Sequence, residues 1–368
     1  MADHSPDHSF MQQALDLARQ GQGKVEPNPM VGCVIVRDGQ VVGQGYHREF
    51  GHAHAESEAL NNAKQSAQGA DVYVTLEPCC HHGKTGPCTA ALIQANVARV
   101  IVGCADPNPE VAGKGLAALR DAGIDVSTDV LGDQAKQLIA PFAKLITTGR
   151  PWVIAKWAMT LDGKIATHTG NSQWISGEAS RGVVHQLRGR VDAILVGRGT
   201  AEADNPRLTA RPSGTRVATR IVLDSLASLS TSSKLCQSSD EAPLLIAATA
   251  AASEENCQRL QDLGAELFVT AGNNRGEQLN ALLDELGRRQ MTNLLVEGGG
   301  EVLGTLFDLG AIDEVHAFVA PKLIGGQAAP TPIAGTGLPT MSQAIGLDQP
   351  QFEQLGDNWY VHGPIKKA

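Results

Sequence analysis

Apolar positions in the first half of the chain show two patterns, one typical of helices and one typical of strands. Met11, Ala14, Leu15 and Ala18 recur at the spacing of one helix face. Two extended runs, residues 31–36 and 41–46, flank Asp38-Gly39, which is typical of a β-hairpin. Further helices are expected over residues 54–64, 89–95 and 115–122, and further extended segments over residues 71–76, 97–104 and 124–130. This alternation predicts a mixed sheet with helices on both faces.

The helical pattern breaks at Thr147-Thr148-Gly149-Arg150-Pro151, and a new strand is expected over residues 152–157. Beyond the break, apolar runs lie at residues 193–196, 221–223, 244–247 and 294–296, with helical patterns such as 178–187 and 277–286 between them. We therefore expect a second α/β domain. A chain of 368 residues is also long for a single domain, and we place the two domains at residues 1–148 and 149–368.

Composition narrows the class of protein. Apolar residues make up 42% of the chain, enough for two buried cores, and the formal net charge is -9. Nucleic acids and anionic membranes attract positively charged surfaces, so we expect no nucleic-acid partner and no membrane partner. No window reaches the ~18 consecutive apolar residues of a membrane span. The seven cysteines form no compact disulfide framework, which favours reduced thiols and a cytoplasmic protein.

One group of residues has the composition of a catalytic zinc site. His54 and Glu56 are followed by Cys79 and Cys88, each cysteine preceded by a proline. One imidazole and two thiolates are ligands that zinc prefers, and three ligands leave a fourth position for water. Zinc makes that water acidic enough to yield hydroxide near neutral pH. Glu56 is two residues from a ligand and is expected to transfer protons, which is the pattern of zinc-dependent base deaminases.

Two features leave other interpretations open. Eight residues separate Cys79 from Cys88, whereas the usual gap between these cysteines in base deaminases is two. A structural zinc site would need a fourth protein ligand, and Cys80, His81 and His82 are available. That interpretation gives Glu56 no role, so the catalytic site is the preferred hypothesis.

A glycine-rich segment stands out in the second half. An apolar strand ends at Glu297 and continues into Gly298-Gly299-Gly300, with a helical pattern over residues 301–309. Such a turn lets backbone amides approach a pyrophosphate at the start of a helix. The spacing of Gly298, Gly300 and Gly304 misses the standard dinucleotide fingerprint. Taken alone the motif is weak, and a tight structural turn is the favoured interpretation.

Several longer motifs together resemble one family. Residues 77–88 (EPCCHHGKTGPC), with 27–32 (PNPMVG), 45–47 (GYH) and 106–109 (DPNP), resemble the deaminase half of the bifunctional riboflavin-biosynthesis deaminase/reductases. Residues 156–163, 172–176, 196–200, 204–211, 222–225 and 320–326 resemble the reductase half of the same family. The resemblance implies a cytidine-deaminase-like three-layer N-terminal domain and a dihydrofolate-reductase-like C-terminal domain.

The resemblance also implies a reaction sequence and a substrate. The zinc site would deaminate 2,5-diamino-6-ribosylamino-4(3H)-pyrimidinone 5′-phosphate, and NADPH would then reduce the ribosyl group to ribityl. Position by position, the base would be bound by Asn28, His47, Asp106 and Asn108, and the ribose phosphate by His81 and Lys84. A lysine between glycines is a plausible phosphate anchor in an acidic protein.

In the second half the resemblance assigns two further sets of residues. The cofactor would be held by Ala158, Trp174, Thr200, Asp204, Ser225, Gly299, Gly300, Glu301, Val302, Leu303, Gly304 and Thr305. The sugar phosphate would be held by Lys156, Ser172, Arg188, Leu208, Arg211 and Glu297. Arginine suits this task because its guanidinium donates a bidentate fork to phosphate.

The expected partner is therefore a small phosphorylated pyrimidine, and a homo-oligomer is compatible with the sequence. One alternative is a deaminase of cytosine or adenine in nucleic acid with an accessory C-terminal domain. The acidic charge and an aromatic content of only 4% oppose it. A second alternative, not an enzyme, is a structural zinc module joined to a nucleotide-sensing domain.

Overall fold

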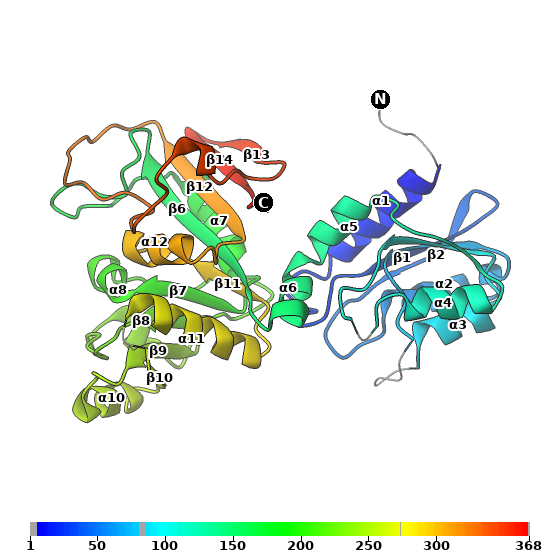
Figure 1. The fold of residues 1–368 in the computed structure, drawn as a ribbon, viewed down its shortest axis with the longest axis horizontal. Coiled ribbons are helices and arrows are strands. Elements are labelled where there is room, and N and C mark those ends of the chain that lie inside the picture. The colour runs from blue at the N-terminus through cyan, green and yellow to red at the C-terminus, as the bar shows by residue number, and fades with distance from the viewer. Residues whose placement is uncertain (1–5, 81–85, 110, 273, 367–368) are drawn as a thin grey trace. The chain divides into compact units, whose positions relative to one another are not determined.

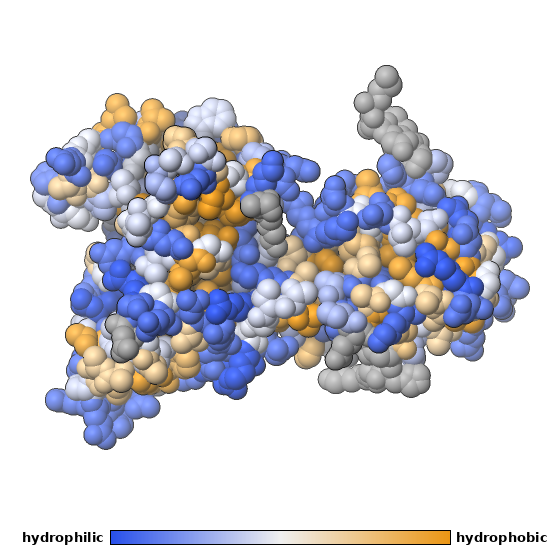
Figure 2. Space-filling view, in the orientation of Figure 1, coloured by the Kyte–Doolittle hydropathy of each residue, from blue (hydrophilic) through white to orange (hydrophobic). Residues whose placement is uncertain are grey.

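The computed structural model describes residues 6–80, 86–109, 111–272 and 274–366. The chain divides into two compact units, Met1–Gly149 and Arg150–Ala368, and each is described by itself. Within the described ranges, no helix has the length and apolar character needed to span a membrane. Hydrophilic side chains cover much of the surface seen in Figure 2, with smaller apolar patches between them.

A five-stranded mixed sheet forms the centre of the first unit (Figure 1). Its strands are β1 (Gly32–Arg37), β2 (Gln40–Tyr46), β3 (Asp71–Leu76), β4 (Arg99–Cys104) and β5 (Asp125–Ser127), in the order β2-β1-β3-β4-β5. The hairpin strand β1 pairs antiparallel with β2 and with β3. The pairs β3–β4 and β4–β5 are parallel, so their carboxyl ends lie at one edge of the sheet.

Helices cover both faces of this sheet, which makes the unit three-layered. One core joins the sheet to α1 (Pro6–Arg19) and α5 (Gly132–Leu138). The opposite core joins it to α2 (Ala55–Ala63), α3 (Cys88–Gln94) and α4 (Lys114–Asp121). Two short helices, η1 (Lys64–Ala67) and α6 (Ala140–Thr148), complete the unit.

The strand side chains alternate between the two cores. Val34 and Val36 of β1 belong to the core under α1, whereas Cys33 and Ile35 belong to the core under α2. Because successive strand residues point to opposite faces, burial of both faces requires an uninterrupted apolar run. The runs that predicted these strands therefore also reflect the helical layer on each side.

The second unit is built on a nine-stranded sheet in the order β10-β9-β8-β7-β11-β6-β12-β14-β13. Its strands are β6 (Trp152–Thr160), β7 (Ala193–Gly197), β8 (Thr219–Leu223), β9 (Leu244–Thr249), β10 (Glu266–Thr270), β11 (Asn293–Val296), β12 (Glu314–Ala320), β13 (Gln351–Leu355) and β14 (Asn358–Pro364). Pairing is parallel from β10 to β12. The β13–β14 hairpin adds two antiparallel strands beside β12.

The helices of this unit are α7 (Glu178–Arg188), α8 (Arg198–Asp204), α9 (Lys234–Gln237), α10 (Glu254–Gln261), α11 (Arg275–Arg288), α12 (Gly300–Asp308) and the short η2 (Met341–Gln343). The leucines of α11 and α12 pack on the parallel strands in one large core. Leu279, Leu282, Leu283 and Leu286 recur at helical spacing and are all buried there. This core fixes α12 against the carboxyl end of β11, where the glycine-rich turn lies.

Most predicted elements appear within a residue or two of their expected bounds, and the mixed α/β architecture is confirmed. The last extended run of the first unit is shorter than expected, because β5 ends at Ser127. The next residues include Asp129 at φ 69° and Leu131 at φ 51°, a left-handed backbone that a strand does not adopt.

Candidate active sites

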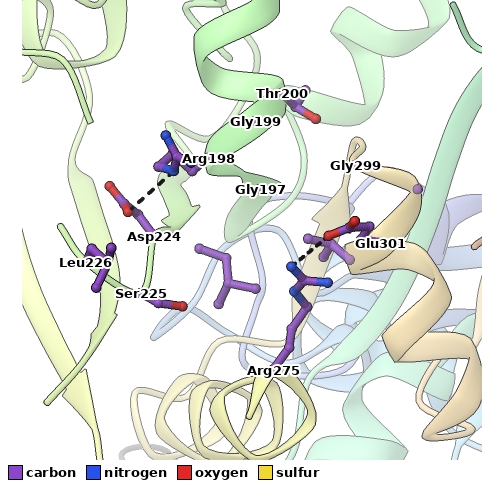
Figure 3. A pocket seen from close by; sticks show the side chains of 13 residues that line it. Gly197, Arg198, Gly199, Thr200, Asp224, Ser225, Leu226, Arg275, Gly299 and Glu301 are labelled. Atoms are coloured by element: carbon purple, nitrogen blue, oxygen red, sulfur yellow. Dashed lines mark ion pairs between the residues drawn. The ribbon is translucent and has the colours of Figure 1, made fainter. Parts of the chain in front are cut away.

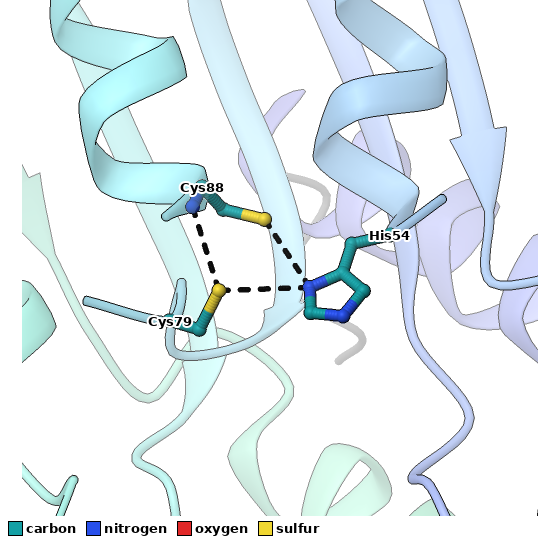
Figure 4. Close-up of side chains that lie close together, drawn as sticks. All are labelled: His54, Cys79 and Cys88. Atoms are coloured by element: carbon teal, nitrogen blue, oxygen red, sulfur yellow. Dashed lines mark hydrogen bonds between the residues drawn. The ribbon is translucent and has the colours of Figure 1, made fainter. Parts of the chain in front are cut away.

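The three predicted zinc ligands come from two helix starts and one strand end. His54 is the N-cap residue of α2, and Cys88 is the first residue of α3. Cys79 follows the carboxyl end of β3. Figure 4 shows the histidine ring and both thiols pointing toward one another. Loops at the carboxyl ends of parallel strands are a common place for ligand sites in α/β proteins.

The distances in this cluster suit a tetrahedral zinc ion. The His54 Nδ1 atom lies 3.5 Å from Cys79 Sγ and 3.4 Å from Cys88 Sγ. Zinc bound at usual Zn–S and Zn–N lengths would place a nitrogen and a sulfur about 3.5 Å apart. All three ligand atoms lie within 4.8 Å of one another, and no fourth His, Cys, Asp or Glu of the described residues joins the group. The donor set fits zinc with one position left open.

The thiols of Cys79 and Cys88 differ in their pKa. The hydrogen bond with Cys88 and the one with His54 lower the pKa of Cys79 to about 4, while the same pairing and burial raise the pKa of Cys88. The backbone amide of Cys88 also donates to Cys79 Sγ at 3.4 Å. Such a donor stabilises a thiolate and orients it, as partners of metal ligands commonly do. Metal binding would release the remaining proton.

Glu56 lies in the first turn of α2 and is only 3% exposed. Burial raises the pKa of its carboxyl group from 4.5 to about 7. A carboxyl group with a pKa near the working pH both accepts and donates protons readily. The position beside His54 and the burial together suit the proton-transfer role expected from the sequence.

Asn28 and His47, predicted to bind the base, are in contact with each other. His47 Nδ1 lies 3.0 Å from the carbonyl oxygen of Ala53, which can only accept, so this nitrogen carries the hydrogen. The Nε2 atom then accepts from Asn28 Nδ2 at 3.1 Å. Burial lowers the pKa of His47, which favours this neutral form. Its ring meets His54 edge-on, with centroids 5.6 Å apart, so both residues adjoin the proposed zinc site.

Glu77 is a buried residue whose importance the sequence did not reveal. Its carboxylate accepts four backbone N–H groups in the loop after β4 and the first turn of α4. The donors are Asp106 at 3.1 Å, Gly113 at 3.0 Å, Gly115 at 2.9 Å and Leu116 at 3.3 Å. The same loop carries Asn108, whose backbone amide donates to Asp106 Oδ1 at 2.8 Å. Glu77 therefore ties the loop of two predicted base-binding residues to the strand that leads to Cys79.

His81 and Lys84, the predicted contacts of the ribose phosphate, lie outside the described residues. Their roles remain predictions.

In the second unit, a buried carboxylate joins two predicted substrate-binding cations. Arg188 donates through Nε and Nη2 to Glu297, at 2.5 and 2.9 Å. Lys156 Nζ lies 3.5 Å from the same carboxylate, whose side chain is 4% exposed. Burial alone would raise the pKa of Glu297, but the two cations hold it at about 2. Burial lowers the pKa of Lys156. Glu297 is therefore the centre of a compact ionic cluster directly after β11.

Other predicted residues of this unit lie in separate local arrangements. The hydroxyl of Ser172, predicted to bind the sugar phosphate, donates at 3.0 Å to the carboxylate of Asp204, predicted to bind the cofactor. Arg211 Nη1 donates to the hydroxyl of Thr209 at 3.2 Å, and burial together with neighbouring arginines lowers its pKa. Trp174 is 65% exposed, and the Arg181 guanidinium lies over its ring, 4.7 Å from the ring centroid. Two predictions are less exposed: the side chain of Leu208 is buried, and Ala158 of β6 packs beside a small core.

A cleft of about 520 Å³ lies at the carboxyl ends of β7, β8 and β11 (Figure 3). It is lined by the predicted cofactor residues Thr200, Ser225, Gly299, Gly300, Glu301 and Val302. Arg198, Asp224, Leu226 and Arg275 also line it, and the sequence-based assignment did not include them. The other predicted cofactor residues of this segment are not among the residues that line the cleft. Leu303 is in the core, Gly304 packs against the Ala334 backbone, and the Thr305 hydroxyl donates to the carbonyl oxygen of Glu301.

The glycines of the turn are required by its backbone. Gly298 has φ +137° and Gly299 has φ +85°, conformations that residues with a side chain rarely adopt. A Cβ atom on Gly300 would lie 2.6 Å from the carbonyl oxygen of Thr331. The structural-turn interpretation and the ligand-site interpretation are thus compatible, because the same turn forms a wall of the cleft.

The ligand set leads to a direct prediction about metal content. Cys88→Ala removes one of three ligand atoms, so we expect the variant to lose tightly bound zinc. Cys80→Ala is the matched control, because Cys80 is, with His81 and His82, one of the residues that a structural site could recruit as a fourth ligand. We expect this control to keep one zinc ion per chain when metal is measured by atomic spectroscopy after dialysis. Full zinc in the Cys88 variant, or loss from the Cys80 variant, would contradict the assignment.

Comparison with protein families matches both units. The model of the RibD C-terminal domain matches residues 151–361. The model of the cytidine and deoxycytidylate deaminase zinc-binding region matches residues 4–104, a range that contains His54, Cys79 and Cys88.

Individual relatives match nearly the whole chain. The riboflavin biosynthesis protein RibD of Actinobacillus pleuropneumoniae is 42% identical over 352 residues, covering 96% of this chain and 93% of the relative. The Escherichia coli protein of the same name is 39% identical over 362 residues, covering 94% and 95%. Each match covers nearly the whole length of this chain and of the relative, so the similarity extends through the two units.

Two solved structures are similar over the same extent. RibD of Acinetobacter baumannii superposes with a TM-score of 0.85 at 35% identity, covering 98% of this chain and 99% of the other. A diaminohydroxyphosphoribosylaminopyrimidine deaminase/5-amino-6-(5-phosphoribosylamino)uracil reductase from Thermotoga maritima superposes with a TM-score of 0.83 at 33% identity, covering 99% of each chain.

Proposed function

This chain belongs to the RibD family of riboflavin biosynthesis proteins, and we propose that it divides the family's two reactions between its two units. The chain is a deaminase and a reductase, with a zinc-binding deaminase domain and a reductase domain of the type that uses NADPH. We assign deamination to residues 1–148 and reduction to residues 149–368. The observation that carries this proposal is the convergence of His54, Cys79 and Cys88 beside Glu56 in one unit, with the cleft in the other.

For deamination, His54, Cys79 and Cys88 would hold the zinc ion. When bound, the ion supplies the positive charge that makes a water acidic near neutral pH. Glu56 would move two protons in turn: one from the attacking water to the ring nitrogen, and a second, from the hydroxyl group that this water leaves on the ring carbon, to the amino group that departs as ammonia. Its pKa of about 7 suits both directions of transfer. The amide of Cys88 would keep the Cys79 thiolate oriented throughout.

The substrate of this site is a small phosphorylated pyrimidine. We propose that it is 2,5-diamino-6-ribosylamino-4(3H)-pyrimidinone 5′-phosphate, which loses its 2-amino group. Asn28 and the neutral His47 would contact the base, as would Asp106 and Asn108 on the loop that Glu77 holds. Buried, correctly oriented polar groups discriminate well between bases, because a wrong partner leaves them unpaired.

For reduction, we propose that the cleft at β7, β8 and β11 holds NADPH. The cofactor supplies the hydride when bound, and the protein positions it. The phosphate-rich middle of the cofactor would lie against Gly299 and Gly300, at the start of α12. Glu297 would orient Lys156 and Arg188 toward the sugar phosphate of the substrate, and the cationic surroundings of Arg211 favour an anion nearby.

Two further expectations from the sequence belong to the proposal. We propose a cytoplasmic location, which agrees with the bacterial relatives. We also propose that a homo-oligomer is the state to test for in solution.

The two reactions differ in product mass and in cofactor need, which gives a simple test. Purified protein is incubated with the diaminopyrimidine phosphate, with or without NADPH, and the products are analysed by mass spectrometry. Without NADPH, we expect release of ammonia, with an oxygen replacing the amino group. With NADPH, we expect a further gain of two hydrogens. An unchanged substrate in both reactions, from zinc-loaded protein, would contradict the proposed function.

A further inference from the structure

The cleft has a direction that follows from the strand order. The proposed reacting end lies near Lys156 of β6 and Glu297 after β11, and the glycine turn also follows β11. From the glycine turn the cleft continues past β7 to β8, because these strands follow one another in the order β6-β11-β7-β8. Three strand spacings separate β6 from β8, about 14 Å. An extended dinucleotide with its reacting ring near Glu297 therefore has its adenosine end at β7 and β8.

Two arginines line this cleft, and both are available to a phosphate. Arg198 pairs with Glu202 at 2.8 Å, and Arg275 pairs with Glu301 at 2.7 Å. Each guanidinium side chain is 46% exposed, and their carboxylate partners are 41% and 71% exposed. Exposed ion pairs contribute little to stability, so an arriving phosphate can replace the carboxylate at low cost.

The two arginines stand at different points along the cleft (Figure 3). Arg275 and its partner Glu301 adjoin the glycine turn, where the pyrophosphate is proposed to lie. Arg198 directly follows β7 and faces the residues after β8, Asp224 and Ser225. Arg198 is therefore at the adenosine end.

We propose that Arg198 binds the 2′-phosphate of NADPH and so selects NADPH over NADH. This inference rests on the proposed function, because it requires the cleft to be the cofactor site. A planar guanidinium donates two parallel hydrogen bonds to a phosphate, and a cofactor without the 2′-phosphate has no anion at this point. Arg198 is a specificity residue in this account and has no part in hydride transfer.

An acidic residue at the end of a strand can instead accept hydrogen bonds from the ribose hydroxyls of NADH, and Asp224 is placed for that role. Its carboxylate is already used by its own loop. It accepts from the amide of Leu229 at 2.7 Å and the hydroxyl of Ser228 at 3.2 Å, and the residue is 2% exposed. Arg198 Nε lies 3.9 Å from Asp224, so this buried charge helps to hold the arginine at the cleft.

Binding of NADP⁺ and NAD⁺, measured by calorimetry on full-length variants, tests the inference without depending on turnover. In Arg198→Met, we expect the dissociation constant for NADP⁺ to rise at least about tenfold, and that for NAD⁺ to change less than twofold. In Arg275→Met, beside the pyrophosphate, both constants should rise together. Arg288→Met, which removes an exposed arginine at the other end of α11, should change neither. Adenosine 2′,5′-bisphosphate should lose affinity for Arg198→Met, whereas adenosine monophosphate should not.

The outcomes separate this inference from the proposed function. If wild-type protein prefers NADP⁺ and Arg198→Met keeps the full preference, the inference about Arg198 is wrong while the function stands. A selective loss of NADP⁺ in Arg275→Met instead would place the 2′-phosphate at the other arginine and also overturn it. If neither dinucleotide binds wild-type protein, the proposed reductase function itself fails.

Discussion

Glu56→Gln is expected to lower the rate of deamination by about 100- to 10,000-fold, the usual contribution of general acid–base catalysis. Glutamine has nearly the same shape but cannot take up or release the proton. Zinc content should stay at one ion per chain, because the three ligand atoms are untouched. Ammonia release from the diaminopyrimidine phosphate under single-turnover conditions measures the effect.

Two controls make the result specific. Glu49→Gln changes an exposed carboxylate in the same unit and should leave deamination unchanged. The Glu56 variant itself should reduce already deaminated substrate at the wild-type rate. Deamination within a few-fold of wild type in a zinc-loaded Glu56→Gln protein would mean that another group moves the proton.

Glu297→Gln is expected to lower the reduction rate by roughly 100-fold or more and to leave deamination near normal. The substitution removes the one negative charge between Arg188 and Lys156, in a place where all three side chains are largely buried. Breaking such a charge pair commonly costs several kcal/mol, because the remaining cations have no buried partner. Oxidation of NADPH, followed by its absorbance with deaminated substrate, measures the effect.

The same substitution also removes stabilising contacts, so a second variant guards against simple unfolding. Asp204→Ala alters an exposed side chain that accepts from Ser172, at little cost to the fold. Reduction should weaken in this variant too, with deamination unchanged. A loss of thermal stability without a selective loss of reduction would assign Asp204 a purely local structural role. Equal losses of both activities in folded Glu297→Gln protein would contradict separate active sites.

Features that depend on local spacing were predictable from the sequence. The positions Met11, Ala14, Leu15 and Ala18 all lie on the buried face of α1, because amphipathic periodicity is set by the helix itself. The three zinc ligands could be proposed together, because metal coordination restricts residue types and places them near element ends. The hairpin of β1 and β2 followed from Asp38-Gly39, where both residues have positive φ.

Features that depend on distant parts of the chain were not predictable. Strand β13 is mostly exposed and carries no continuous apolar run, so its existence follows from pairing with β14. Arg198 lies within a motif matched by resemblance, yet only the neighbouring β8 loop gives it a ligand-binding context. Arg275 had no local signal at all. Glu77 precedes the zinc-ligand motif, but its four amide donors lie about thirty or more residues away and meet it only in the fold.

The central claim is that one chain carries two independent active sites, and mixing two single-site variants tests it most directly. Glu56→Gln and Glu297→Gln proteins, each folded and zinc-loaded, are incubated separately and together with the diaminopyrimidine phosphate and NADPH. We predict that the Glu297 variant alone stops at the deaminated compound. The mixture should complete the conversion, with a mass spectrum showing both the lost amino group and the two added hydrogens. A mixture that yields no doubly converted product would contradict the account.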